Sequence, residues 1–136
     1  MFSLQILKLY ASTAIVFLAI DIVWLGVVAS DFYQKHLGHL MRSDVILPAA
    51  LLFYLLYVVA ILVFAVLPGL ESQSINRTLA LGAFLGLVAY STFDLTCLAL
   101  FKNFPVKVVI IDLIWGTVLT ATVAGISHKI GEFLSF

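Results

Sequence analysis

Four long apolar segments make up most of this chain, and they restrict the folds that it can adopt. The segments cover residues 9–28, 46–67, 79–100 and 106–126. About twenty apolar residues in a helix, rising about 1.5 Å per residue, cross the roughly 30 Å hydrocarbon core of a bilayer. Only 10% of the residues are charged, whereas soluble domains have about 25%. The sequence therefore predicts an all-α integral membrane protein, a four-helix bundle surrounded by membrane lipids.

Short connections separate the four segments. Pro68 and Gly69 are predicted to end the second segment, and Pro105 suits the first turn of the fourth. Four spans place both termini on the same side of the membrane, here called side A, with side B opposite. Three Lys and Arg residues belong to side A and four to side B, which leaves the orientation open. We expect a single transmembrane domain, residues 1–136.

The connection between the first two spans, residues 30–45, has the pattern of a short helix. Apolar side chains recur there at nearly helical spacing: Phe32, Tyr33, Leu37, Leu40 and Met41. Basic and imidazole side chains lie among them: Lys35, His36, His39 and Arg42. Such an amphipathic pattern is typical of a helix that lies in the membrane interface.

Composition and motifs exclude several classes of function. Seven Lys and Arg residues balance seven Asp and Glu residues, so no nucleic-acid partner is indicated. The single Cys97 excludes an internal disulfide and a zinc site with several thiolates. His36 and His39 have the spacing of metal ligands, but two such histidines without a third ligand are usually solvated. No metal site and no cofactor are therefore predicted.

Three aspartates lie within the spans at nearly one depth. Asp21 is seven residues before the end of the first span, and Asp94 is six before the end of the third. Asp112 is six residues after the start of the fourth, and Tyr54 is eight residues into the second. By helical rise each aspartate is about 10 Å inside side B. Since a carboxylate there costs at least about 2.5 kcal/mol on insertion scales, these acids indicate a ligand or proton site, with hydrogen bonding between helices that fixes their packing as the alternative.

The third span carries a repeat that aims Asp94 at the rest of the protein. Every fourth residue on one face belongs to this repeat: Gly82, Gly86, Tyr90 and Asp94. Two glycines four apart are a close-packing pattern for membrane helices. Asp94 is therefore expected to face protein rather than lipid, with Ser91 and Thr96 adding polar groups to the same part of the helix.

The first and last spans repeat one motif, since Asp21 and Trp24 are three residues apart, as are Asp112 and Trp115. Residues at this spacing are neighbours on a helix, so each indole N–H is able to donate to a carboxylate or to a ligand. Trp24 lies near the membrane boundary, where tryptophans commonly serve as anchors. Trp115 lies deeper and is the better candidate for a site.

The way in which the acids are neutralised bears on their role. No Lys or Arg falls in the middle of a span, so protonation, a bound cation, hydroxyl donors, or a boundary lysine such as Lys107 must compensate the charge. Burial and mutual repulsion both disfavour a second and third negative charge in one place. A cluster of this kind is suited to proton exchange.

Several motifs combine these residues with others along nearly the whole chain: Asp21-x-x-Trp24-Leu-Gly26, Phe32-Tyr33, Phe53-Tyr54-Leu-Leu-Tyr57, Pro68, Tyr90-x-x-x-Asp94-Leu-Thr96 and Asp112-x-x-Trp115-Gly116. In these motifs the chain resembles a family of small bacterial inner-membrane proteins known only as a domain of unknown function. The resemblance implies four spans and a place in a bacterial inner membrane, and it implies no established activity.

The sequence leaves three functions open. The first is binding or translocation of a proton, a cation or a polar headgroup in an acidic cavity open to side B. There the three aspartates would hold or exchange charge, and Tyr54, Tyr90 and Trp115 would orient the ligand. The second is an enzyme acting on a lipid or isoprenoid through a pair of carboxyl groups. The third is an assembly or lipid-organising subunit, and small residues on a helix face allow a homo-oligomer.

Overall fold

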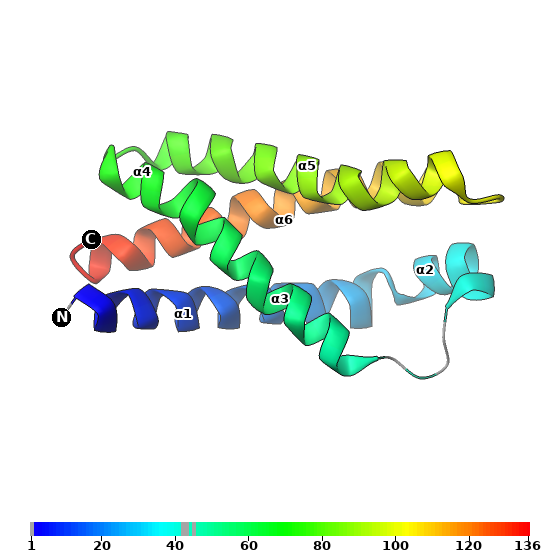
Figure 1. Cartoon of the computed structure of the whole chain (residues 1–136), viewed down its shortest axis with the longest axis horizontal. Helices are drawn as coiled ribbons and strands as arrows, with labels where there is room; N and C mark the ends of the chain where they lie inside the picture. The colour runs from blue at the N-terminus through cyan, green and yellow to red at the C-terminus, as the bar shows by residue number, and fades with distance from the viewer. Residues whose placement is uncertain (1, 42–43, 45) are drawn as a thin grey trace.

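The computed structural model describes residues 2–41, 44 and 46–136 of the chain. In this part of the chain every regular element is a helix and no strand occurs. Figure 1 shows the long helices side by side, with both termini at the same end, which is side A. The predicted all-α membrane bundle is confirmed. Arg42 and the end of the predicted loop helix lie outside the described residues.

Among the described residues, four helical stretches are long and apolar enough to cross a membrane: Leu4–Val28, Leu47–Glu71, Ile75–Leu100 and Val106–Phe133. The last two correspond to α5 (Ile75–Leu100) and α6 (Val106–Phe133). Both helices extend toward side A beyond the apolar segments predicted from the sequence, 79–100 and 106–126. Polar residues at these ends continue the helix, since their backbone groups form the same hydrogen bonds. The side chain of Ser74, for example, accepts a hydrogen bond from the Arg77 N–H at 3.1 Å and caps α5.

The second span is interrupted but not ended at Pro68. It consists of α3 (Leu47–Ile61), a π-helical turn η3 (Leu62–Val66) and α4 (Leu67–Glu71). The expectation that Pro68 and Gly69 close this span was wrong, since α4 continues through both. Proline has no N–H and its ring crowds the carbonyl one turn earlier. A widened π turn just before Pro68 accommodates this without ending the helix.

A second π-helical turn joins the first span to the loop helix. The helix α1 (Phe2–Val23) passes into η1 (Trp24–Val28), and α2 (Ser30–Leu37) begins two residues later. The Ala29 N–H donates to the Trp24 carbonyl at 2.8 Å, and the Tyr33 N–H donates to the Ala29 carbonyl at 3.0 Å. These bonds turn the chain at Ala29 and lead α2 over the side-B end of the bundle. The predicted short helix is confirmed, and it is followed by a 3₁₀ turn η2 (Gly38–Leu40).

The half of the bundle near side A is closely packed. Its centre contains Leu9, Phe17, Ile61, Leu119 and Val123, each at most 1% exposed. Lipid tails are as apolar as these side chains, so the hydrophobic effect does not hold the helices together within a membrane. Dispersion contacts in a closely packed centre stabilise the bundle instead.

Polar side chains in this half are paired with one another. Three close pairs of donors and acceptors join different helices: Thr13 Oγ1 with Ser127 Oγ at 2.6 Å, Tyr57 OH with Thr120 Oγ1 at 2.7 Å, and Thr78 Oγ1 with His128 Nδ1 at 2.6 Å. Since lipid offers no substitute partner, each pair favours the native arrangement of the helices.

Glycines let α5 and α6 approach most closely. A Cβ atom added at Gly86 would collide with the carbonyl oxygen of Gly116, and one added at Gly82 would come within 2.9 Å of Ala124 Cβ. The glycine repeat of the third span therefore packs within this chain, against α6. The same face carries Asp94, which is 1% exposed.

The second span diverges from α5 toward side B. Its side-A portion, η3 and α4, packs on α5, whereas α3 packs on α1. In Figure 1, α3 crosses the bundle obliquely and its N-terminal half lies away from α5. This divergence leaves a space between α3 and α5 on one flank of the bundle, and α2 lies beside that space.

Candidate functional site

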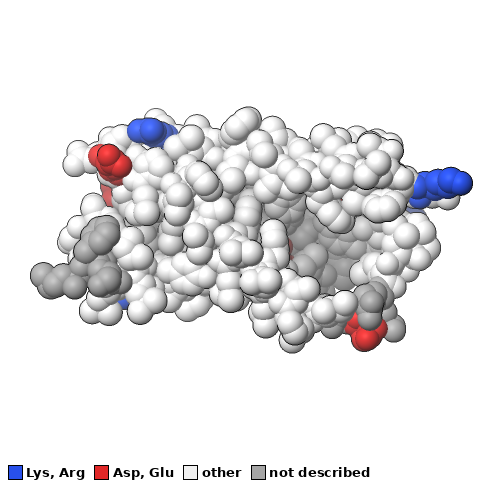
Figure 2. Space-filling model, in the orientation of Figure 1, with Lys and Arg blue, Asp and Glu red and all other residues white. Residues whose placement is uncertain are grey.

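A cavity of about 790 Å³ occupies the side-B half of the bundle, where α3 and α5 diverge. Its wall is formed by residues of α1, η1, α2, α3, α5 and α6. Figure 2 shows the molecule hollowed between α3 and α5 beside α2, while the blue and red side chains of this face gather near the two ends. The uncharged band between the ends suits the apolar interior of a membrane.

All three span aspartates line this one cavity, from α1, α5 and α6. Asp21, Asp94 and Asp112 are 6%, 1% and 8% exposed. Aromatic side chains form much of the remaining wall: Trp24, Tyr33, Phe53, Tyr54, Tyr90, Phe93 and Trp115. The structure thus brings together seven of the nine residues that the sequence nominated, the three aspartates with Tyr54, Tyr90, Trp24 and Trp115.

The other two nominated residues, Ser91 and Thr96, do not line the cavity. Successive residues of a helix are turned by about 100°. Tyr90 and Phe93 therefore lie on one side of Asp94, toward the cavity, while Ser91 lies on the other. Thr96 is exposed on the far side of α5.

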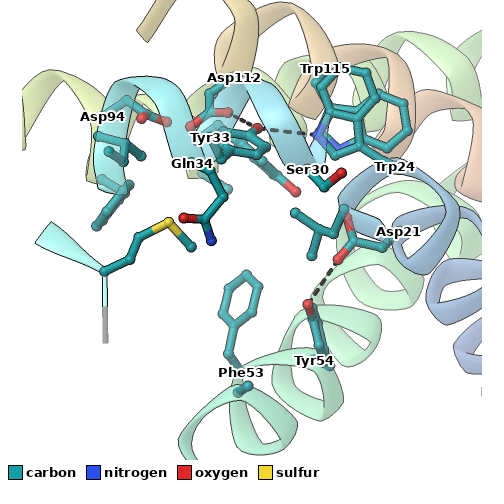
Figure 3. A pocket seen from close by; sticks show the side chains of 17 residues that line it. Asp21, Trp24, Ser30, Tyr33, Gln34, Phe53, Tyr54, Asp94, Asp112 and Trp115 are labelled. Carbon is teal, nitrogen blue, oxygen red and sulfur yellow. Dashed lines mark hydrogen bonds between the residues drawn. The ribbon is translucent and has the colours of Figure 1, made fainter. Parts of the chain in front are cut away.

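One edge of the cavity is a chain of polar contacts that starts on the loop helix. The Tyr33 hydroxyl donates to Asp112 Oδ1, and the Trp24 Nε1–H donates to the Tyr33 oxygen at 3.2 Å. The Asp112 carboxyl in turn interacts with that of Asp94. Figure 3 shows Tyr33 between Asp112 and the indole. Burial, with the Asp112 bond second, raises the pKa of Tyr33 well above its ordinary value, so this hydroxyl remains a donor.

Asp94 differs from the other two aspartates in having no hydrogen-bond donor. Both of its carboxylate oxygens are buried without a hydrogen-bond partner among the described residues. A buried polar atom without a partner costs about 1–3 kcal/mol, and more when it is charged. Its neighbour Asp112 is itself an acid, so two carboxyl groups meet here with the Tyr33 hydroxyl as the donor beside them.

Asp21 lies apart from this pair and has its own donor. The Tyr54 hydroxyl of α3 donates to Asp21 Oδ2 at 2.9 Å. Phe17 packs edge-on against the Tyr54 ring, with centroids 5.5 Å apart, and so fixes its position. Trp115 Nε1 lies near Asp21 but is buried without a hydrogen-bond partner. The three acids therefore form a pair and a separate third group, rather than one cluster.

The two indoles stand between these acidic groups. Trp24 and Trp115 stack with their centroids 4.2 Å apart and 9° between their planes. Trp24 is the first residue of the π turn η1, which changes the phase of the helix after Asp21. The π turn leads the chain to α2, and the Trp24 indole bonds Tyr33 of that helix.

Sequence reasoning did not nominate several polar and aromatic wall residues, which include Tyr33 and Gln34 of α2, Phe53 of α3 and Phe93 of α5. The most consequential is Tyr33, the only phenol in residues 30–45. A signal for it was present, because a phenol on a helix predicted to lie at side B is at the right depth to meet the acids.

No Lys, Arg or His belongs to the described wall of the cavity. Lys107, one of the candidates for neutralising the acids, is exposed and outside the wall. Among the described residues, no three His, Cys, Asp or Glu side chains are placed to share a metal ion. The wall thus combines negative charge, hydroxyl groups and aromatic faces.

Comparison with known proteins places the chain at the level of a family. A family model described as "Predicted membrane protein (DUF2177)" matches residues 6–128. Neither a curated protein nor a solved structure matches the chain. Because the matched region covers most of the chain, including the greater part of each span and every wall residue of the cavity, the chain belongs to this family of membrane proteins of unknown function.

Proposed function

We propose that this protein, in a bacterial inner membrane as the resemblance of its motifs implies, binds the polar head of a membrane amphiphile in the acidic cavity. The head donates hydrogen bonds or positive charge to Asp94, and the apolar tail remains in the bilayer. Asp21, Tyr54, Tyr90 and Trp115 orient the head from other parts of the wall.

The observation that carries this proposal is the lack of a donor for Asp94. Its carboxyl group is 1% exposed, belongs to the wall of a 790 Å³ cavity and has no hydrogen-bond partner among the described residues. Buried acids in membrane helices are expensive, and they pair with a partner where one exists. A ligand in the cavity is the partner that the fold leaves room for.

The shape of the cavity favours binding over permeation through a single chain. The wall residues lie toward side B, whereas the layer next to them on the way to side A is filled by Phe17 and the hydrogen-bonded pair of Tyr57 and Thr120. Protein interiors packed in this way leave no room for a solvated ion. Translocation would need a rearrangement of that layer.

The wall also bears on the alternative of an enzyme for lipids or isoprenoids. A phosphate or diphosphate head needs cationic donors, and the described wall contains none. A neutral or cationic head suits the same wall without any rearrangement.

The chain contains only two tryptophans, Trp24 and Trp115, and both belong to the cavity wall. Their fluorescence therefore reports on the site. The purified protein, in micelles of a polyoxyethylene ether, is titrated with dodecyl glucoside, dodecyltrimethylammonium and dodecyl phosphate. We expect a saturable response to at least one of the first two and none to the phosphate.

Asp94→Asn should weaken that response about tenfold, the loss of one charge-assisted interaction. Glu71→Gln, which changes an exposed acid at the end of α4 outside the cavity, is the matched control and should respond like the wild type. An absence of saturable response to both probes, or equal responses in wild type and Asp94→Asn, would overturn the proposal.

A further inference from the structure

We infer that the head held in the cavity is an organic ammonium group, enclosed by aromatic rings between Asp21 on one side and the Asp94–Asp112 pair on the other, and that it enters laterally between α3 and α5. This inference rests on the proposed function and names the chemical class of its ligand.

Charge selects a cation over a neutral head. Of the 17 wall residues, three are acids and none is Lys, Arg or His. Tyr54 and Tyr33 each supply one donor, to Asp21 and Asp112, and Asp94 receives none from the residues that the structure describes. A neutral polyol could fill the missing hydrogen bond. A cation fills it too, and it also compensates the negative charge that burial and mutual repulsion otherwise disfavour among the three acids.

The type of cation follows from the rest of the wall. Ca²⁺ and Mg²⁺ bind through oxygen ligands held close together, mostly carboxylates, and the described residues include no group of three His, Cys, Asp or Glu side chains placed to hold an ion. Seven of the 17 wall residues are aromatic instead. Aromatic faces attract large, weakly hydrated cations, and cages of such rings are the usual way in which proteins bind quaternary ammonium groups.

The rings stand on different walls of the cavity, as a cage requires. In Figure 3, Phe53 and Tyr54 lie along one side, and Tyr33 and Trp115 lie along the opposite side. Phe53 and Tyr54 are tilted by 52° to each other, with centroids 5.7 Å apart, so they offer two differently directed faces. Trp24 backs Trp115 in the stacked pair and holds its ring in place.

The mouth of the cavity opens on the flank of the bundle. Phe53 of α3 and Phe93 of α5 both belong to the wall, and they are 48% and 60% exposed. Both lie within the stretches Leu47–Glu71 and Ile75–Leu100 that are apolar enough to span a membrane. A ligand that leaves through this mouth meets lipid tails, which is the position that an alkyl chain on the ammonium would take.

The test compares two probes that differ only in charge. Dodecyltrimethylammonium and its neutral isostere, in which a quaternary carbon replaces the nitrogen, are titrated into the protein in polyoxyethylene ether micelles while tryptophan fluorescence is followed. The ammonium should act at a mole fraction about tenfold lower than the isostere, the size expected for a desolvated cation–π and ion-pair site.

Two variants separate the charge from the cage. Asp94→Asn should remove most of the preference for the ammonium. Phe53→Leu changes a half-exposed residue at the mouth, so the fold should tolerate it, and it should weaken the ammonium several-fold while leaving the isostere unchanged.

The outcomes distinguish this inference from the proposed function. If the isostere, an alkane without a polar head, binds as tightly as the ammonium, the cavity takes an apolar chain and both proposals are wrong. If dodecyl glucoside binds and the ammonium does not, the ammonium cage is wrong and a site for the polar head of an amphiphile remains. If neither the ammonium nor the glucoside gives a saturable response, both proposals are wrong.

Discussion

Trp24 of η1 and Trp115 of α6 stack face to face, with ring centroids 4.2 Å apart and 9° between the planes. The stack joins the two Asp-x-x-Trp motifs crosswise. Trp24 reaches Asp112 through Tyr33, while Trp115 lies near Asp21. Each motif therefore completes the surroundings of the other, and the first and last spans are coupled at the cavity.

Removal of the Tyr33 hydroxyl should destabilise this coupling. Tyr33→Phe leaves Asp112 without its phenol donor and the Trp24 N–H without an acceptor. Because a hydrogen bond to a charged group contributes about 1.5–3 kcal/mol, we expect the free energy of unfolding to fall by about 2 kcal/mol. Tyr10→Phe, which removes a phenol bond to the carbonyl of Leu55, should cost about 1 kcal/mol. Denaturant titration in micelles measures both, and an equal effect of the two variants would contradict the assignment.

The contribution of Tyr33 should also depend on pH. Folding raises the pKa of Tyr33, through burial and the bond to Asp112. The protonated phenol is therefore favoured in the folded state, so its contribution is complete below the unfolded pKa of about 10 and is lost as the pH rises above it. We expect the difference in unfolding free energy between wild type and Tyr33→Phe to be constant from pH 7 to 9, as far as about one unit below that value, and to shrink at higher pH. A difference that stays constant beyond pH 11, about one unit above it, would contradict this.

The position of each aspartate along its helix follows from the sequence, but its partners do not. Counting residues from the span ends fixes height, because an α-helix rises by a constant amount per residue. The direction of a side chain depends on an unbroken helical phase. The π turn that starts at Trp24 breaks this phase, and no residue pattern in that segment announces it.

The cavity, like the partners of the aspartates, depends on tertiary packing that the sequence does not show. The apolar segment that forms α3 has no polar stripe to show which neighbour it packs on, so the sequence is compatible with close contact to α5. Its divergence from α5 follows from the π turn η3 ahead of Pro68. Only Pro68 was visible as a signal, and it predicted the end of the helix rather than its redirection.

The close approach of α5 and α6 should be the least tolerant part of the fold. A methyl group at Gly86 meets the backbone carbonyl of Gly116, which has no rotamer to move into. Gly86→Ala should therefore lower the unfolding free energy by about 1–3 kcal/mol, the usual cost of overpacking. Gly26→Ala is the matched control, because a Cβ atom there has nothing within 4 Å. Equal melting temperatures of the two variants in micelles would show that the helices do not meet in this way.

The buried pair of Thr78 and His128 offers a test of the packed half that leaves the cavity untouched. Thr78→Val removes the hydroxyl 2.6 Å from His128 Nδ1 and leaves a buried ring nitrogen without that partner. We expect a loss of about 1–3 kcal/mol, the desolvation cost of an unsatisfied buried group, with no change in the tryptophan response to amphiphiles. Thr92→Val, on the exposed face of the same helix, removes only a bond to the carbonyl of Val88. It should unfold like the wild type, because solvent or detergent can reach that position. If Thr78→Val changed the tryptophan response to amphiphiles as well as the unfolding free energy, the two halves of the bundle would be coupled rather than separate.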